Sequence, residues 1–194
     1  MTRKRLWQWI VSIVVVLPFI ELSAAEESKV EYAATRIIQS GSGPFEGEVS
    51  SQIYVSGNKE RIETQVGSQY MITIVRPDKH VAWLLSPQEK TYQEIAIDNT
   101  FSVNHERYFD RSKLKMVGEE NIEGIKTIKY KAVSAKGLFA GHIWLSEKSI
   151  PLKIEKADDK VSGQSGVSII LRDLRVGLQT PSLFELPQGF KKVP

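Results

Sequence analysis

The sequence predicts a mainly β (α+β) domain built on an antiparallel sheet, and three observations lead to this fold class. Short stretches of alternating apolar and polar residues recur along the chain, separated by turn residues about every ten positions. Hydrophobic residues make up 41% of the chain and cysteine is absent, so a packed core must provide the stability. Few segments remain for helices, so the sheet either curls on itself or is covered by one or two helices.

The first 25 residues read as a cleavable signal peptide. A basic patch, Arg3-Lys4-Arg5, precedes the apolar stretch Leu6–Ile20, and the small residues Ser23 and Ala25 follow. This order predicts cleavage before Glu26, with cleavage one residue earlier as the alternative. The competing interpretation is a permanent membrane anchor. The apolar stretch is shorter than the ~20 residues that span a bilayer, which favours the cleaved signal.

Residues 26–194 are predicted to form a single domain that is free in its compartment after export. A lipid-modified cysteine at the cleavage site is excluded because the chain has no cysteine. Arg3, Lys4, Arg5 and Glu21 lie in the predicted signal, so the domain carries 23 basic and 22 acidic residues. A net charge near +1 gives no electrostatic reason to expect a nucleic-acid partner.

The first half of the domain contains six predicted elements. The first, Val30–Gln39, fits either a strand or a helix. Glu48–Ser56 and Lys59–Val66 follow as strands joined by Gly57-Asn58, a turn signal. The clearest region is a meander of three strands connected by proline-containing turns at 76–79 and 86–89. Its predicted strands are Met71–Val75, His80–Leu85 and Lys90–Ile97.

The second half contains five more predicted strands. Residues 98–112 separate the two halves, and Asn104–Phe109 has the composition of a short helix start with poor apolar periodicity. The adjacent acids Glu119-Glu120 and Asp158-Asp159 are expected in turns. The predicted strands are Lys113–Val117, Ile125–Val133, Ala140–Leu145, Leu152–Lys156 and Val167–Val176.

Some predicted strands are apolar on both faces. Val81, Trp83 and Leu85 alternate with Ala82 and Leu84. Such a strand is either covered by a second layer or has one face turned toward an apolar cavity. Periodicity cannot distinguish a filled interior from a hollow one, and an ordinary core is the more common case.

The sequence contains no recognisable catalytic or metal-binding motif. His80, His105 and His142 are scattered, without the spacing of metal ligands. There is no Gly-x-Ser-x-Gly elbow, and the run Gly41–Gly47 lacks both the dinucleotide spacing and the lysine of a nucleotide loop. We therefore expect no metal, no cofactor and no enzymatic activity.

A series of short motifs resembles bacterial periplasmic proteins related to the LolA/LolB lipoprotein carriers. The motifs occur in the expected order and extend over nearly all of residues 26–194. They are Tyr54–Glu63, Ile74–Lys79 with Val81-x-Trp83, Lys90–Tyr92, Gly118–Gly124, Trp144–Ser146, Ile150–Glu155 and Leu183–Phe190.

This resemblance implies an unclosed, strongly curved antiparallel β half-barrel with one or two short helices covering the concave face. In the named carriers the concavity holds lipoprotein acyl chains between the two membranes. The resemblance also implies a lipid or a lipid-modified protein as partner, and transient contact with envelope membrane proteins. The gating arginine of those carriers has no aligned counterpart here, so no such role is transferred.

Two functions follow as hypotheses. The first is a periplasmic, non-enzymatic protein that carries or senses an apolar ligand in its concavity. The alternative is an interaction or scaffold module of the cell envelope, with a filled core and its function on an edge strand or loop. The residues predicted to line the concavity are Met71, Trp83, Leu85, Tyr92, Tyr130 and Trp144.

Overall fold

A computed structural model of the chain describes residues 30–41, 47–97, 113–133, 139–157 and 166–194. The predicted signal peptide, residues 1–25, and the predicted helix start at 104–109 lie outside the described residues. Nothing in the described part of the chain is a helix long and apolar enough to cross a membrane.

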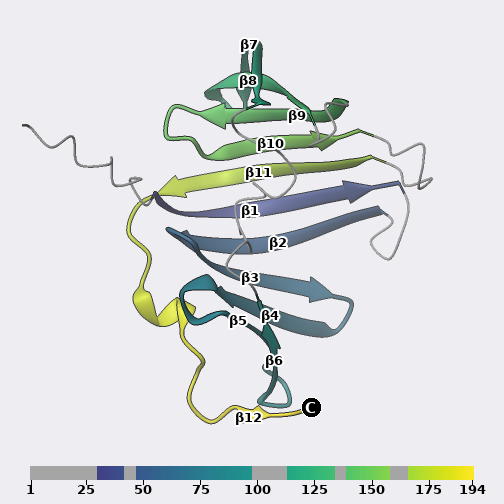
Figure 1. Cartoon of the computed structure of the whole chain (residues 1–194). Coiled ribbons are helices and arrows are strands. Elements are labelled where there is room, and N and C mark those ends of the chain that lie inside the picture. Colours follow the sequence, from purple (N-terminus) through teal and green to yellow (C-terminus); the bar gives the residue numbers. More distant parts are fainter. Residues whose placement is uncertain (1–29, 42–46, 98–112, 134–138, 158–165) are drawn as a thin grey trace, which may run out of the picture.

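The fold is one unclosed, curved sheet of twelve strands (Figure 1). All neighbouring strands pair antiparallel except β12, which lies parallel to β6. In spatial order the sheet runs β12-β6-β5-β4-β3-β2-β1-β11-β10-β9-β8-β7. The strands are β1 (Glu31–Ser40), β2 (Gly47–Ser56), β3 (Lys59–Val66), β4 (Gln69–Arg76), β5 (Val81–Ser86), β6 (Thr91–Ala96), β7 (Lys115–Ile122), β8 (Ile125–Val133), β9 (Phe139–Ser146), β10 (Pro151–Lys156), β11 (Val167–Val176) and β12 (Lys191–Lys192).

The first strand lies in the middle of the sheet rather than at an edge. Strands β2 to β6 follow one another outward from one side of β1, and β7 to β11 return toward its other side. The pairing of β1 with β11 therefore joins the two halves of the chain. This topology turns two meanders into one continuous surface.

Tight turns set the register of the hairpins. Glu123 and Gly124 connect β7 to β8 with φ values of 48° and 78°, the pair of positive angles that suits the twist of a two-residue hairpin. Between β4 and β5, the 3-10 helix η1 (Pro77–Lys79) ends at His80, whose φ is 55°. The turn therefore spans Pro77–His80 instead of the predicted residues 76–79, and the next strand begins at Val81 rather than at His80.

The C-terminal segment, residues 177–194, crosses the outer strands of one half of the sheet (Figure 1). It contains the 3-10 helix η4 (Pro181–Phe184), which contacts β3 and β4, and it ends as β12 beside β6. Arg61 donates to the carbonyl oxygen of Leu183 at 3.2 Å, and Arg76 donates to that of Phe184 at 2.9 Å. These bonds fix the segment to the sheet.

The predicted fold class, an unclosed and curved antiparallel sheet, is confirmed. Val30–Gln39, left open as strand or helix, is strand β1. Glu119-Glu120, expected in a turn, lies within β7, because the hairpin turn comes later at Glu123-Gly124. The helices among the described residues are η1 and η4, and η4 lies on the side of Arg61 and Arg76, opposite the apolar face described below.

Candidate functional site

The pairing register assigns every strand residue to one of two faces. Residues opposite one another in an antiparallel pair point to the same side, and neighbours along a strand point to opposite sides. Tyr32 pairs with Val55, and Ala34 with Ile53, which is in turn paired with Ile62. We call the side that these residues share the apolar face and the other side the opposite face.

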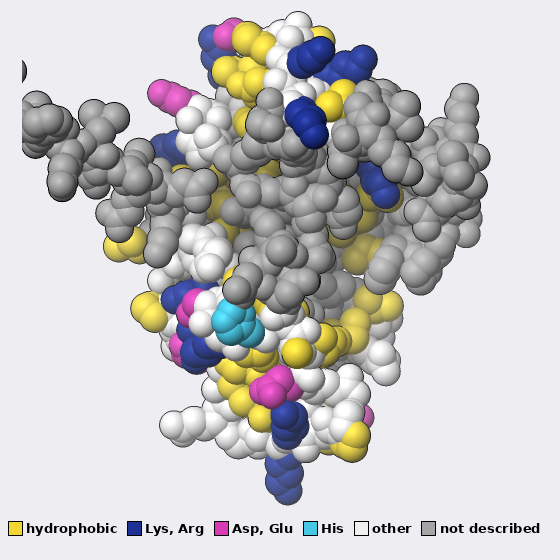
Figure 2. All heavy atoms as spheres, in the orientation of Figure 1, with side chains coloured by type: hydrophobic (Ala, Val, Ile, Leu, Met, Phe, Trp, Pro, Cys, Tyr) yellow, Lys and Arg dark blue, Asp and Glu magenta, His cyan; other side chains and the backbone are white. Residues whose placement is uncertain are grey.

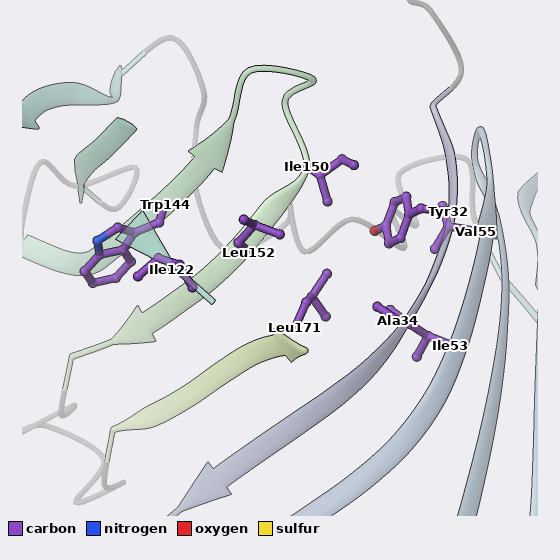
Figure 3. Packing of buried hydrophobic residues seen from close by; sticks show 9 residues of the cluster. All are labelled: Tyr32, Ala34, Ile53, Val55, Ile122, Trp144, Ile150, Leu152 and Leu171. Carbon is purple, nitrogen blue, oxygen red and sulfur yellow. The ribbon is translucent and has the colours of Figure 1, made fainter. Parts of the chain in front are cut away.

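The centre of the apolar face is a buried hydrophobic cluster (Figure 3). Side chains from β1, β2, β10 and β11 point into the hollow of the curved sheet (Figure 3). The same cluster also contains Ile122 and Trp144, which the register places on the opposite face of β7 and β9. Strands from both halves of the chain thereby contribute to one hydrophobic cluster. Its buried members are Tyr32, Ala34, Ile53, Val55, Ile122, Trp144, Ile150, Leu152 and Leu171.

The apolar face continues from this cluster onto β3–β6, where it reaches the surface. Val66, Met71, Leu84 and Ile95 all point to this side, and their exposed fractions are 53%, 45%, 38% and 47%. We call these four residues the β3–β6 apolar patch. Figure 2 shows hydrophobic side chains, with Lys, Arg, Asp and Glu side chains among them, at the surface of the lower half of the molecule, where β3–β6 lie.

Charged side chains avoid the apolar face over the same four strands. Glu60 is the single charged residue of β3–β6 that points to it, and Glu60 is buried. The others point to the opposite face, where the C-terminal segment covers part of the sheet. They are Lys59, Arg61, Glu63, Arg76 and Glu94. The exposed part of the apolar face over β3–β6 therefore has no charged side chain, and exposed apolar patches are typical of interaction surfaces.

A buried ion pair lies beside the hydrophobic cluster. Arg36 Nη1 is 2.9 Å from Glu60 Oε1, and the two side chains are 7% and 6% exposed. Ser51 and Thr64 share a hydrogen bond of 2.8 Å on the same face. Burial raises the pKa of Glu60 against the opposing effect of Arg36, and burial together with Glu60 raises the pKa of Tyr32. The apolar face thus contains a small polar site within its core.

A second hollow lies where β8 begins and where β9 and β11 end. It has a volume of about 560 Å³, and we call it the end pocket. Leu145, Ile128, Leu174 and Val176 contribute to it from the apolar face. The remaining lining residues are Glu119, Ile125, Lys126, Thr127, Ser146, Glu147, Lys148 and Ile150.

A larger hollow of about 720 Å³ lies at the other ends of β1, β9, β10 and β11. Its lining is more polar and includes Gln39, His142, Glu155 and Ser168. The described ranges contain no group of three or more His, Cys, Asp or Glu side chains arranged to hold a metal ion.

Comparison with known proteins identifies the family. A family model described as "Domain of unknown function (DUF4412)" matches residues 39–166. The chain belongs to the DUF4412 family. No curated protein matches the sequence. The DUF4412 match includes the whole β3–β6 apolar patch and ends before β11, so the C-terminal segment lies outside it.

Solved structures share the fold at low sequence identity. An uncharacterized conserved protein from Thermus thermophilus is 14% identical, with a TM-score of 0.59 and coverage of 86% of this chain and 91% of that one. MucB in the MucA/MucB complex of Pseudomonas aeruginosa is 15% identical with a TM-score of 0.50, and the match covers 82% of this chain and 56% of that one.

A putative outer membrane lipoprotein-sorting protein domain from Vibrio parahaemolyticus is a more remote match. It is 11% identical, with a TM-score of 0.38 and coverage of 79% of this chain and 88% of that one. Identities this low support a shared fold for the first two structures and nothing finer. This DUF4412 chain spans little more than half of the MucB-containing match.

The six residues predicted to line the concavity of this DUF4412 domain lie on two faces. Met71 and Tyr130 point to the apolar face, Met71 in the β3–β6 apolar patch and Tyr130 on β8. Trp83, Leu85 and Tyr92 point to the opposite face and pack with Leu186 and Phe190 of the C-terminal segment. Ligand contact by any of the six stays a prediction.

Trp144 also points to the opposite face, on β9. Its ring lies between the ammonium groups of Lys129 and Lys153, each 4.7 Å from the ring centroid. Its indole N–H donates to Glu120 at 2.7 Å, and Glu120 also pairs with Lys129 at 2.9 Å. Hydrogen bonds from Lys129 and Trp144 lower the pKa of Glu120. These contacts occupy both the ring and the N–H of a side chain that is 1% exposed.

Sequence reasoning missed most of the β3–β6 apolar patch. Val66 and Ile95 lie near strand ends and gave no local signal beyond alternation. Alternation correctly assigned Leu84 to the side opposite Trp83, and this was the one sequence signal that pointed to the patch. The missing information was which side the C-terminal segment covers.

Proposed function

We propose that this DUF4412 protein is an exported, periplasmic, non-enzymatic binding protein of the LolA/LolB-like kind. Its ligand is apolar, either a lipid or the acyl chain of a lipid-modified polypeptide, and it binds along the apolar face. The export and the periplasmic location rest on the basic, apolar and small-residue pattern of residues 1–25.

The observation that carries the proposal is the β3–β6 apolar patch. Four neighbouring strands expose Val66, Met71, Leu84 and Ile95 on a face without exposed charge, next to the buried core. Covering such surface gains about 25 cal/mol per Å² of apolar area removed from water. A protein that left this face bare without a function would accept that cost and an aggregation risk as well.

Lipid extraction tests the proposal. The mature protein would be incubated with vesicles that contain a fluorescent diacyl phosphatidylethanolamine, and native mass spectrometry and fluorescence would measure the lipid that leaves with the protein. We expect Met71→Glu and Leu84→Glu to reduce the extracted lipid at least tenfold, because each places a charge on the patch.

The matched control is Leu178→Glu, which adds the same charge at a residue that is 94% exposed and lies in the C-terminal segment. The control should extract lipid like the wild type. Equal extraction by the two patch variants and the wild type, or no uptake by any of them, would reject the proposal.

A protein-interaction module is the second candidate function. The related fold of MucB is found in complex with MucA. Here the edge strand β7 exposes Met116 and Val117 at 61% and 57%, and an open strand edge readily pairs with another chain. A mature protein without lipid, whose crosslinks to an envelope protein disappear in Met116→Glu, would favour this function.

A further inference from the structure

We propose that the end pocket binds the hydrocarbon chain of a single-chain phospholipid with a zwitterionic head, a lysophosphatidylethanolamine being the simplest example. The inference rests on the proposed function, because it narrows the ligand class from any apolar molecule to one acyl chain. It also assigns that chain to a site distinct from the β3–β6 apolar patch.

The inner lining of the end pocket matches an acyl chain. Leu145, Ile128 and Leu174 come from three strands of the apolar face. Ile125 is the first residue of β8, and Ile150 lies in the turn before β10. A methylene chain against such side chains gains about 0.8 kcal/mol for each buried CH₂.

The size of the pocket favours one chain rather than two. Its volume of about 560 Å³ lies in the middle of the range of roughly 300–1,000 Å³ in which proteins bind small ligands. A second acyl chain would have to lie outside the pocket. A single-chain amphiphile fills the pocket with its tail and leaves its head at the mouth.

The β9–β10 turn holds the mouth in one conformation. The carbonyl oxygen of Ser146 accepts the backbone N–H of Ser149 at 2.9 Å, and the backbone N–H of Ser146 donates to the carbonyl oxygen of Ile150 at 2.9 Å. The side-chain oxygen of Ser146 accepts the N–H of Ile150 at 3.1 Å. Ile150 is buried, so the turn that contains Glu147 and Lys148 is anchored beside the pocket, and both residues line it.

The charges at the rim match a zwitterion. Lys126 is already paired with Glu119 at 2.8 Å. Glu147 and Lys148 are exposed, and within the part of the chain that the structure describes neither forms an ion pair. One free carboxylate beside one free ammonium complements a head group that has an ammonium and a phosphate, whereas a simple anion would meet Glu147 as well.

Calorimetric titration tests the site. The mature protein would be titrated with 1-palmitoyl lysophosphatidylethanolamine below its critical micelle concentration, and with palmitate for comparison. We expect the zwitterion to bind at least fivefold more tightly than palmitate. Lys148→Ala should reduce its affinity about fivefold, while Lys115→Ala, which removes an exposed lysine outside the pocket, leaves the affinity unchanged.

Filling the pocket provides the second arm. Leu174→Trp and, as an independent variant, Ile128→Phe should each reduce lysophospholipid affinity at least tenfold, with melting temperatures showing which variant is folded. Equal affinity in a folded filled variant, or equal binding of palmitate and the zwitterion, would overturn the inference. Met71→Glu separates the two proposals, since it should reduce diacyl lipid extraction at least tenfold and leave lysophospholipid binding unchanged.

Discussion

Arg36 and Glu60 form an ion pair of 2.9 Å between β1 and β3 on the apolar face, with both side chains almost completely buried. The pair has one charge of each sign in a core that is otherwise built from aliphatic and aromatic side chains. Removing a single partner leaves the other charge without compensation.

Arg36→Met should therefore lower the free energy of unfolding by about 3–5 kcal/mol. The double variant Arg36→Met/Glu60→Met should be closer to the wild type, because both charges are gone and the volume is retained. Urea unfolding of the three proteins measures the difference. A double variant less stable than Arg36→Met would contradict this account.

The pH dependence of Arg36→Met should also have a definite sign. Glu60 already has a raised pKa, and loss of Arg36 raises it further. At a pH between the unfolded and the folded pKa of Glu60, the folded state binds a proton that the unfolded state has lost. Protonation of Glu60 therefore stabilises the fold at low pH, and this stabilisation is lost as the pH rises. The deficit of Arg36→Met against the wild type should shrink from pH 7 to pH 5. A constant deficit would contradict the assignment.

Glu31 should contribute stability with the opposite pH dependence. Its carboxylate accepts the backbone N–H of Gln179 at 2.6 Å and the hydroxyl of Ser56 at 2.7 Å, and these bonds lower its pKa. The contribution is therefore present above the ordinary glutamate pKa and is lost as pH falls through the lowered value. Glu31→Gln should therefore make the loss of stability less steep as the pH falls below the ordinary glutamate pKa of 4.5. Glu147→Gln is the control, and an identical effect of both substitutions would contradict the prediction.

The C-terminal segment should be a cooperative part of the fold. Phe184 is 2% exposed, so Phe184→Ala should cost about 3–5 kcal/mol of unfolding free energy. Leu178→Ala in the same segment should stay within about 0.5 kcal/mol of the wild type, because Leu178 is almost fully exposed. Chemical denaturation monitored by tryptophan fluorescence measures both. If Phe184→Ala and Leu178→Ala changed the free energy of unfolding equally, Phe184 would not be buried against the sheet as described.

Gly141 should tolerate no side chain. A Cβ atom there would lie 1.8 Å from the carbonyl oxygen of Glu155, and the φ angle of 140° is already outside the range of ordinary residues. Gly141→Ala should therefore cost at least about 2 kcal/mol through strain and displacement of β9 from β10. Gly118→Ala is the matched control, with no atom within 4 Å of its Cβ. Thermal unfolding distinguishes the two, and a neutral Gly141→Ala would refute the close approach.

The strands could be predicted from the sequence because their signal is local. Alternation in Val81–Leu85 correctly assigned Trp83 and Leu84 to different sides of the sheet. The alternation in Leu152–Lys156 likewise assigned Leu152 and Ile154 to the buried side of β10. The order of the strands could not be predicted. The pairing of β1 with β11 depends on contacts between distant segments, which leave no periodic pattern in either one.

The candidate site was predictable only in part for the same reason. Met71 could be selected as an apolar strand residue, and it lies in the exposed patch. Trp83 has the same local pattern, yet Leu186 and Phe190 cover its side of the sheet. No feature near residue 83 indicates that residues about a hundred positions later will pack there. The end pocket likewise requires β8, β9 and β11 to meet.

The central position of β1 constrains how the chain acquires its structure during synthesis. Thr35 and its hydrogen-bond partner Asp173 are 138 residues apart, so β1 obtains its second neighbour only when almost the whole polypeptide has emerged. Contacts this distant in sequence also form slowly. A chain that leaves a ribosome from its N-terminus therefore cannot complete the pairing of β1 until β11 is free.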